Sequence, residues 1–129
     1  MDPIWIGLPL TLIVHDEQLA EHGGQDGIRD IGGLESALAR PRNILACTQS
    51  SPSIPELAAA YAVGITQNHP FIDGNKRTAL VICFTFLELN GWTITADLQT
   101  RYIMFDGLAS GRTTPEEFAT WLKASCEPK

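Results

Sequence analysis

The chain has 129 residues, of which 44% are hydrophobic and 19% are charged, and its formal net charge is -6. This length and composition predict one globular domain, residues 1–129, and exclude a disordered chain, which would combine few apolar residues with a high net charge. The nine lysine and arginine residues are scattered along the sequence. No basic stripe is therefore present to neutralise nucleic-acid phosphates, and we predict no direct nucleic-acid partner.

Cysteine usage and hydropathy indicate the cellular compartment of the protein. Cys47, Cys83 and Cys126 are far apart and form no CxxC pair, which argues against a zinc site or a disulfide framework. Residues 1–12 lack the basic flank and cleavage site of a signal peptide, and the longest near-apolar run, residues 78–87, is too short to cross a bilayer. We therefore expect a soluble, cytoplasmic protein with no membrane partner, in which Cys83 is a buried thiol.

Glycine and proline outline two helices in the first part of the chain. The first helix begins at Pro9 and ends at about Glu21, before a glycine pair that suits a left-handed cap. The second helix is short, residues 34–40, because Pro41 disfavours a helical conformation in the residue before it. The residues that follow, 42–52, are rich in Ser, Gln, Thr and Pro in their second half and are predicted to be irregular.

Two longer helices are predicted in the middle of the chain. Ser53 and Glu56 form a capping-box pattern that starts a helix ending near Asn68. The next helix runs from about Asn75 to Asn90, and its middle is apolar on every side, which is typical of a central, buried helix. A buried strand is the alternative interpretation of so short an apolar run.

The last third of the sequence predicts a short extended piece, residues 92–95, and two more helices. Asp97 caps a helix that reaches about Leu108, and Thr114 with Glu117 forms a second capping box. The whole pattern indicates an all-α domain of about six helices. The last helix turns three large apolar side chains toward the core, namely Phe118, Trp121 and Leu122.

The six-residue loop between the two central helices has an unusual content. His69 can be neutral near pH 7 and accept a proton from an attacking hydroxyl, and Asp73 offers the hard oxygen ligands that Mg²⁺ prefers. Gly74 permits a tight turn at a helix N-terminus, where unpaired N–H groups bind anions. Lys76 and Arg77 oppose the helix dipole, which indicates that an anion sits between them. Together these residues predict a phosphate-binding site.

Each feature of this loop also has a purely structural explanation. His69 before a proline can stop a helix, Asp73 can cap the next helix, and Lys76 with Arg77 can form a solvated face. The combination of all these residues in register on one loop favours a site. Phe71 alternates with the polar residues and is predicted to anchor the loop in the core.

Other titratable residues receive structural interpretations. His15 and His22 lie seven residues apart on the first helix and are interpreted as surface or core histidines. Glu35 is interpreted as a helix-surface carboxylate. Arg29 and Asp30 are neighbours in a predicted turn, where they can form a local pair.

The segment from His69 to Arg77 resembles the signature of the Fic/Doc family, H-x-F-x-(D/E/N)-(A/G)-N-(G/K)-R. The match runs through nine consecutive positions, of which seven are specified. Residues 21–30 and 33–41 also resemble death-on-curing (Doc) toxins, and the similarity covers roughly residues 10–125. The resemblance implies a single Fic/Doc-like all-α domain with its active-site loop between two central helices.

This resemblance implies a role for each matching position of the loop. His69 corresponds to the catalytic base of the family, and Asp73 corresponds to the metal-binding acid. The implied cofactors are ATP and Mg²⁺. The implied nucleotide- and phosphate-binding residues are Gly74, Asn75, Lys76 and Arg77.

Two positions depart from the G-N-G-R-x-x-R pattern of AMP-transferring Fic enzymes. Lys76 stands at the second glycine and Leu80 at the last arginine. Lysine at that position is the Doc pattern, and it implies a toxin kinase that moves the γ-phosphate of ATP to a threonine or serine hydroxyl of a protein. The family's target is elongation factor Tu, whose modification arrests translation. AMP transfer to protein hydroxyls and a catalytically inactive binding module are the alternatives.

Many Fic proteins carry their own inhibitory helix, with the pattern (S/T)-x-x-x-E-(G/N). No glutamate in this sequence meets both flanking requirements, and the nearest case, residues 113–117, is followed by Phe118. The resemblance therefore implies inhibition in trans by a Phd-like antitoxin, whose disordered tail folds into a helix on the toxin groove.

Overall fold

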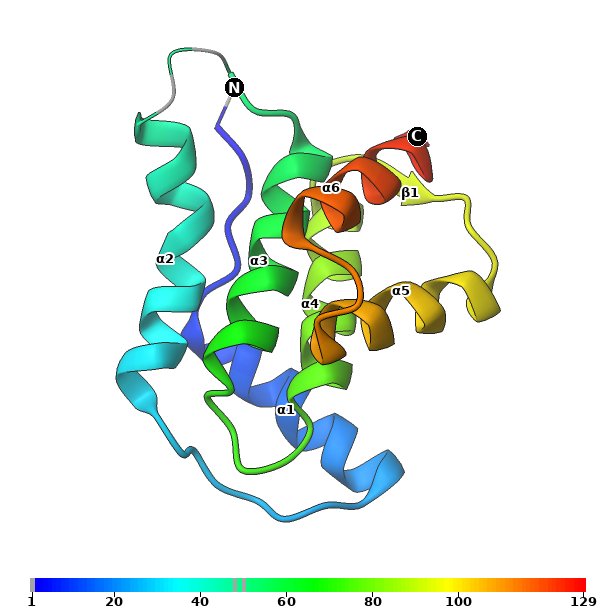
Figure 1. Cartoon of the computed structure of the whole chain (residues 1–129). Helices are drawn as coiled ribbons and strands as arrows, with labels where there is room; N and C mark the ends of the chain where they lie inside the picture. The colour runs from blue at the N-terminus through cyan, green and yellow to red at the C-terminus, as the bar shows by residue number, and fades with distance from the viewer. Residues whose placement is uncertain (1, 48, 50) are drawn as a thin grey trace.

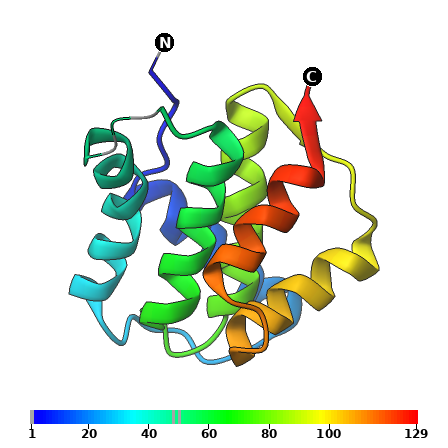
Figure 2. The ribbon, with the colours of Figure 1, turned by 45° about the horizontal axis from the view of Figure 1, so that its top comes forward.

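The computed structural model describes residues 2–47, 49 and 51–129. Within these residues the chain forms six α-helices and two three-residue strands, which confirms the all-α fold class (Figure 1, Figure 2). The helices, in chain order, are α1 (Leu8–His22), α2 (Ile31–Cys47), α3 (Ile54–Asn68), α4 (Asn75–Leu89), α5 (Leu98–Ser110) and α6 (Pro115–Ala124). The strands are β1 (Trp92–Ile94) and β2 (Cys126–Pro128).

Helix α3 is the centre of the molecule. It packs against α4, α2 and α6, and Figure 1 shows it between α2 and α4. Its residues from Leu57 to Thr66 are all buried, because small side chains such as Ala58 and Ala62 let neighbouring helices approach on every side. The apolar run on the next helix forms α4, not a strand, and Cys83 is fully buried there as predicted.

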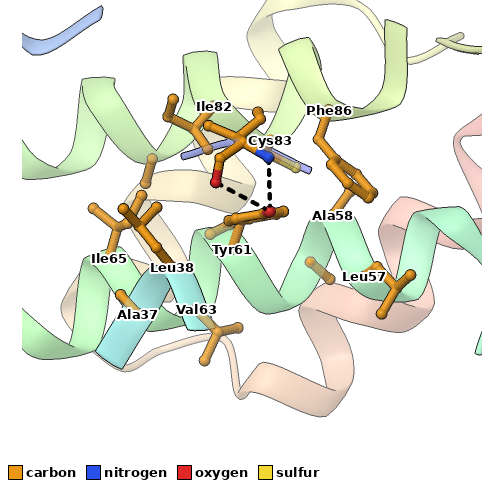
Figure 3. Close-up of a cluster of buried hydrophobic side chains, with 14 of the residues drawn as sticks. Ala37, Leu38, Leu57, Ala58, Tyr61, Val63, Ile65, Ile82, Cys83 and Phe86 are labelled. Carbon is orange, nitrogen blue, oxygen red and sulfur yellow. Dashed lines mark hydrogen bonds between the residues drawn. The ribbon is translucent and has the colours of Figure 1, made fainter. Parts of the chain in front are cut away.

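Tyr61 of α3 fastens the N-terminal segment to this core (Figure 3). Its hydroxyl accepts a hydrogen bond from the Ile6 N–H at 3.0 Å and donates one to the Ile6 carbonyl at 3.4 Å. Burial raises the pKa of the Tyr61 hydroxyl, which keeps the donor protonated. Because Ile6 lies next to Gly7, the N-cap residue of α1, this contact helps to set where that helix starts.

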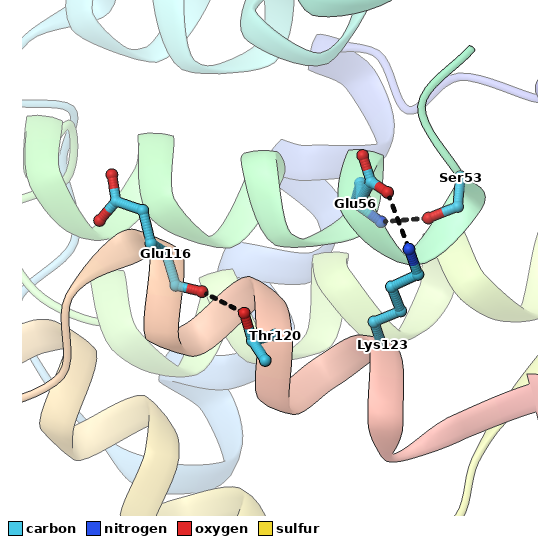
Figure 4. Close-up of polar contacts among 5 residues, drawn as sticks. All are labelled: Ser53, Glu56, Glu116, Thr120 and Lys123. Carbon is cyan, nitrogen blue, oxygen red and sulfur yellow. Dashed lines mark hydrogen bonds and ion pairs between the residues drawn. The ribbon is translucent and has the colours of Figure 1, made fainter. Parts of the chain in front are cut away.

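The predicted helix caps are present in the structure. The Ser53 hydroxyl accepts from the Glu56 N–H at 3.3 Å, and the Asp97 carboxylate accepts from the Thr100 N–H at 2.7 Å. Figure 4 shows the α3 cap, and it also shows Lys123 of α6 reaching Glu56, 3.3 Å away. Thr114 and Glu117 form the complete reciprocal capping box at the start of α6.

The predicted end of the second helix is wrong. Helix α2 runs from Ile31 to Cys47 and includes Pro41, so neither the short helix over residues 34–40 nor the irregular segment after it is present up to Cys47. Proline cannot donate to the carbonyl four residues earlier, which belongs to Ala37. Ala37 packs closely on α3, where a Cβ added to Gly64 would lie 3.1 Å from its Cα and 3.3 Å from its carbonyl oxygen. Burial of this helix face outweighs the cost of the lost hydrogen bond. The predictions for residues 48 and 50 lie outside the described residues.

The two short strands, one after α4 and the other after α6, form a small antiparallel sheet. β1 occupies the predicted extended piece, and it pairs with β2 in the register Trp92↔Pro128 and Ile94↔Cys126. The sequence did not indicate β2. In the last helix, Phe118 and Leu122 are buried as predicted, while Trp121 is partly buried against the core. Among the described residues, no helix combines the length and the apolar character needed to span a bilayer.

Candidate active site

The predicted loop, residues 69–74, joins α3 to α4. It begins at His69, which caps α3 in the left-handed conformation with φ 46° and ψ 55°. His69 is the one non-glycine residue among those described with a positive φ, and backbone conformations of this kind cluster at functional sites. Its imidazole is exposed, and its one side-chain hydrogen-bond partner among the described residues is the Asn75 amide nitrogen, 3.5 Å from Nδ1.

Asn75, the first residue of α4, closes the loop on itself. Its Oδ1 accepts from the Phe71 N–H at 2.9 Å, and its Nδ2 donates to the Phe71 carbonyl at 2.8 Å. The Phe71 ring is 1% exposed, so it anchors the loop in the core as predicted. Because the Asn75 side chain is committed to these bonds, any contribution of Asn75 to an anion site comes from its backbone N–H.

The segment between α1 and α2 pairs with the loop from outside. The N–H groups of Arg29 and Asp30 donate to the Pro70 carbonyl at 2.7 and 3.0 Å, and the Ile72 N–H donates to the Gly27 carbonyl at 3.1 Å. Figure 1 shows both segments at the same end of the helices, the light-blue one running beneath the green one. These bonds hold the loop against a second stretch of backbone.

The predicted local pair of Arg29 and Asp30 is wrong. The Arg29 guanidinium donates instead to the carbonyls of His69 at 2.9 Å and Asn68 at 3.1 Å, where it satisfies groups at the end of α3. The Asp30 carboxylate accepts from the Gly33 N–H at 2.9 Å in the first turn of α2. Each side chain therefore serves a helix end, and Arg29 also fixes the backbone of His69.

Asp73 is held at both its carboxylate and its carbonyl. Its Oδ2 accepts from the Gln25 N–H at 2.7 Å, and its carbonyl oxygen lies 2.8 Å from His15 Nε2. The carboxylate is exposed, and its Oδ1 has no hydrogen-bond partner among the described residues. One oriented oxygen is therefore free for a hard cation, which fits the way Mg²⁺ is bound through one or two carboxylates and phosphate oxygens.

A cavity of about 340 Å³ opens beside this loop. The residues from Asp73 to Arg77, which include every predicted metal- and phosphate-binding position, line one wall. The end of α1 supplies the other wall through Gln18, His22 and the following glycines. The sequence analysis assigned His22 no site role, because nothing in its local pattern indicates that the end of α1 lies beside this loop. His69, at the start of the same loop, is not part of the cavity lining.

The two cations at the start of α4 differ in their surroundings. The Arg77 guanidinium makes no hydrogen bond or ion pair with any described residue, so the interpretation of this cation as a partner for an external anion still applies to Arg77. Lys76 forms an ion pair with Asp106 of α5. The Lys76 ammonium beside Asp106 lowers the pKa of that carboxyl, and the pair is about half exposed. Asp106 lies thirty residues away, so the sequence did not reveal this protein anion.

Comparison with known proteins identifies a matching family and two relatives of this chain. The model of the Fic/DOC family matches residues 5–87, a range that contains the whole loop and ends within α4. Toxin Doc from Mycolicibacterium smegmatis is 40% identical over 75 residues, which cover 58% of this chain and 58% of that protein. Protein kinase doc from Escherichia phage P1 is 34% identical over 80 residues, which cover 62% of this chain and 63% of that protein. The matched region thus spans less than two thirds of either relative.

Proposed function

Because the chain belongs to the Fic/DOC family, we propose that it is a Doc-type toxin kinase that transfers the γ-phosphate of ATP to a protein hydroxyl. One observation carries the proposal: the consecutive residues from Asp73 to Arg77 line a single cavity, and they form the end of the loop that bears His69 and the first turn of α4. The two relatives, one named a toxin and the other a protein kinase, support the same class.

Each group of the loop has one task in this reaction. The exposed His69 imidazole accepts the proton of the attacking threonine or serine hydroxyl. The hydroxyl oxygen bonds to the γ-phosphorus of ATP while the bond from that phosphorus to the β–γ bridging oxygen breaks, and ADP leaves. Arg77 and the N–H groups that begin α4 bind the phosphates of ATP, since a helix N-terminus favours anions. Asp73 would hold Mg²⁺ through its free carboxylate oxygen. The ion, when bound, neutralises charge on the transferring phosphoryl group.

Two residues of α4 favour transfer of the γ-phosphate over transfer of AMP. Lys76 fills the place where AMP-transferring relatives have a glycine, and Leu80 replaces the second phosphate-clamping arginine. Leu80 is partly buried against the core, so it brings no polar group to a nucleotide. The proposed target, elongation factor Tu, rests on the family resemblance.

Label transfer tests this function directly. The protein is incubated with elongation factor Tu and ATP labelled at either the α or the γ phosphate. Label that moves only from the γ position supports the kinase, and label that moves only from the α position would make the protein an AMP transferase. Transfer of neither label would favour a binding module that has kept the fold.

Removing the groups proposed to bind Mg-ATP should weaken its binding. We expect Arg77→Ala to raise the dissociation constant at least tenfold, since a hydrogen bond to a charged group contributes roughly 1.5–3 kcal/mol. Asp73→Asn keeps an acceptor for the Gln25 N–H but loses the charge, and it should reduce the Mg²⁺ dependence of transfer. Isothermal titration calorimetry and single-turnover rates measure both effects.

Arg40→Ala is a matched control, because Arg40 is an exposed arginine on α2 that does not line this cavity. Unchanged Mg-ATP affinity and unchanged turnover in both site variants would contradict the assignment of this site.

A toxin of this kind requires restraint, and we propose that a separate Phd-like antitoxin supplies it. A partner that binds only the folded protein stabilises it by about 2.7 kcal/mol at a free concentration one hundred times its dissociation constant. Co-expression of the antitoxin should therefore suppress growth arrest and raise the melting temperature of the protein. A chain that is harmless when expressed alone, although it transfers phosphate in vitro, would contradict the need for such a partner.

A further inference from the structure

His15 of α1 has more contacts with the active-site loop than its sequence context suggests. Its side chain is 2% exposed, and its ring lies parallel to the Phe71 ring, with the centroids 3.8 Å apart and an interplanar angle of 8°. Its Nε2 lies 2.8 Å from the Asp73 carbonyl oxygen. A Cβ added to Gly74 would meet the same ring at 3.4 Å. One buried histidine thus contacts two residues of the loop, and its ring lies beside a third, Gly74.

The bond to the Asp73 carbonyl specifies which nitrogen of His15 carries hydrogen. A carbonyl oxygen only accepts, so His15 Nε2 must donate to it. A half-turn of the ring about Cβ–Cγ would keep its plane against Phe71, but it would place the Cε1 carbon near the Asp73 carbonyl, so this bond specifies the orientation with Nε2 there. His15 is therefore a fixed donor, aimed at a peptide group directly before α4.

This bond orients the Gly74 N–H as well as the Asp73 carbonyl. The peptide bond between Asp73 and Gly74 is trans, so its C=O and N–H point in opposite directions. With the carbonyl turned toward His15, the N–H is turned away from it. The Gly74 N–H donates to no described group, and Gly74 lines the cavity beside α4. An unpaired N–H held in one direction is what an anion site at a helix N-terminus needs.

We propose that His15 is a positioning residue for the phosphate site, which presents the Gly74 N–H to an anion and keeps the Asp73 carboxylate beside it. The inference rests on the proposed function and deepens it, because His15 touches no reacting atom. His15 acts through the Asp73–Gly74 peptide, while the Gln25 N–H holds the carboxylate end of Asp73.

Three substitutions separate the hydrogen bond from the packing of the ring. His15→Gln places an amide donor near the position of Nε2, whereas His15→Asn carries the same amide on a shorter side chain that falls short of the Asp73 carbonyl. His15→Phe keeps an aromatic ring against Phe71 but has no donor. Thr11→Val is the control, because Thr11 is buried one turn earlier on α1 and its hydroxyl bonds to the Gly7 carbonyl, away from the loop.

The probe is inorganic pyrophosphate with Mg²⁺, followed by calorimetry and by the amide resonance of Gly74 in the ¹⁵N-labelled full chain. Pyrophosphate should move this resonance in the wild type and in His15→Gln. Binding should weaken about tenfold in His15→Asn and His15→Phe, by the loss of one oriented donor. With ATP, these two variants should raise KM and leave kcat nearly unchanged, since the lost contact is made in the ground state as well.

Two results would overturn the role of His15. One is equal pyrophosphate affinity in the Asn, Phe and wild-type proteins. The other concerns Thr11→Val, if it lowers the melting temperature as much as His15→Asn does. An equally large loss of pyrophosphate affinity in both variants would show that the effect follows stability and not the hydrogen bond. If His15→Phe does not fold, the Gln and Asn pair still decides between the outcomes. Pyrophosphate binding that depends on His15, without any phosphate transfer by the wild type, would reject the proposed function and keep this inference.

Discussion

Replacing His69 by alanine is expected to lower the rate of phosphate transfer by about 10²–10⁴-fold, the usual loss when a general base is removed. The fold should be unaffected, because the imidazole is exposed and, within the described part of the chain, its side chain has one hydrogen-bond partner, the Asn75 amide at 3.5 Å. Rates are measured in single turnover with saturating Mg-ATP, and the melting temperature is recorded beside them. On expression, the variant should no longer arrest growth.

The left-handed backbone of His69 calls for a second variant. His69→Asn also removes the base, but asparagine tolerates a positive φ better than alanine does. If backbone strain caused the defect, the asparagine variant would recover activity. If loss of the base causes it, both variants should be equally inactive. A His69→Ala protein that is expressed at the wild-type level and still arrests growth would show that the base lies elsewhere.

The second large effect is expected at Lys76. The family resemblance places Lys76 at the second glycine of the AMP-transferring pattern, and we propose that its side chain fills the space which that glycine would leave open. We therefore expect Lys76→Gly to lose kinase activity and to gain a trace of AMP transfer. The reason is positional: the phosphorus atom that stands in line with the attacking hydroxyl is the one transferred. Adding Leu80→Arg should increase the AMP transfer, because it restores a second phosphate clamp. Intact-mass spectrometry of the target protein distinguishes the two products.

The ion pair between Lys76 and Asp106 determines which controls this experiment needs. Lys76→Gly also leaves the Asp106 carboxylate without its partner near the cavity, so Asp106→Asn should be combined with it. Lys76→Ala removes the cation but keeps a Cβ and avoids the cost of about 1 kcal/mol that glycine brings to a helix interior. A gain of AMP transfer in the glycine variant alone would identify space as the determinant. A Lys76→Gly enzyme that phosphorylates as fast as the wild type would contradict the proposal for this lysine.

Local sequence patterns were reliable where the interactions themselves are local. The caps at Ser53, Asp97 and Thr114 join atoms three residues apart, so the residue types alone predicted the starts of α3, α5 and α6. The same holds for the loop before α4, whose ends the sequence placed correctly at Asn68 and Asn75. The roles of the loop residues in catalysis stay predictions.

Errors arose where a distant contact overrides a local preference. Pro41 is a helix breaker by its covalent structure, yet α2 continues through it because the same helix face packs on Gly64 of α3. Arg29 and Asp30 are adjacent in sequence, yet each bonds to a different helix end. Lys76 and Asp106 form an ion pair across thirty residues, and Asp106 lies outside the range that the family model matches.

The amino-acid sequence by itself determined the all-α class, most helix boundaries and the position of the loop from His69 to Gly74. These features depend on residue types within a few positions of one another. Only the tertiary structure decided what surrounds that loop. The end of α1 became the second wall of the cavity, His15 became a buried donor to Asp73, and Asp106 became the partner of Lys76. These contacts join residues thirty or more positions apart, and no local pattern encodes which side chains helix packing will bring together.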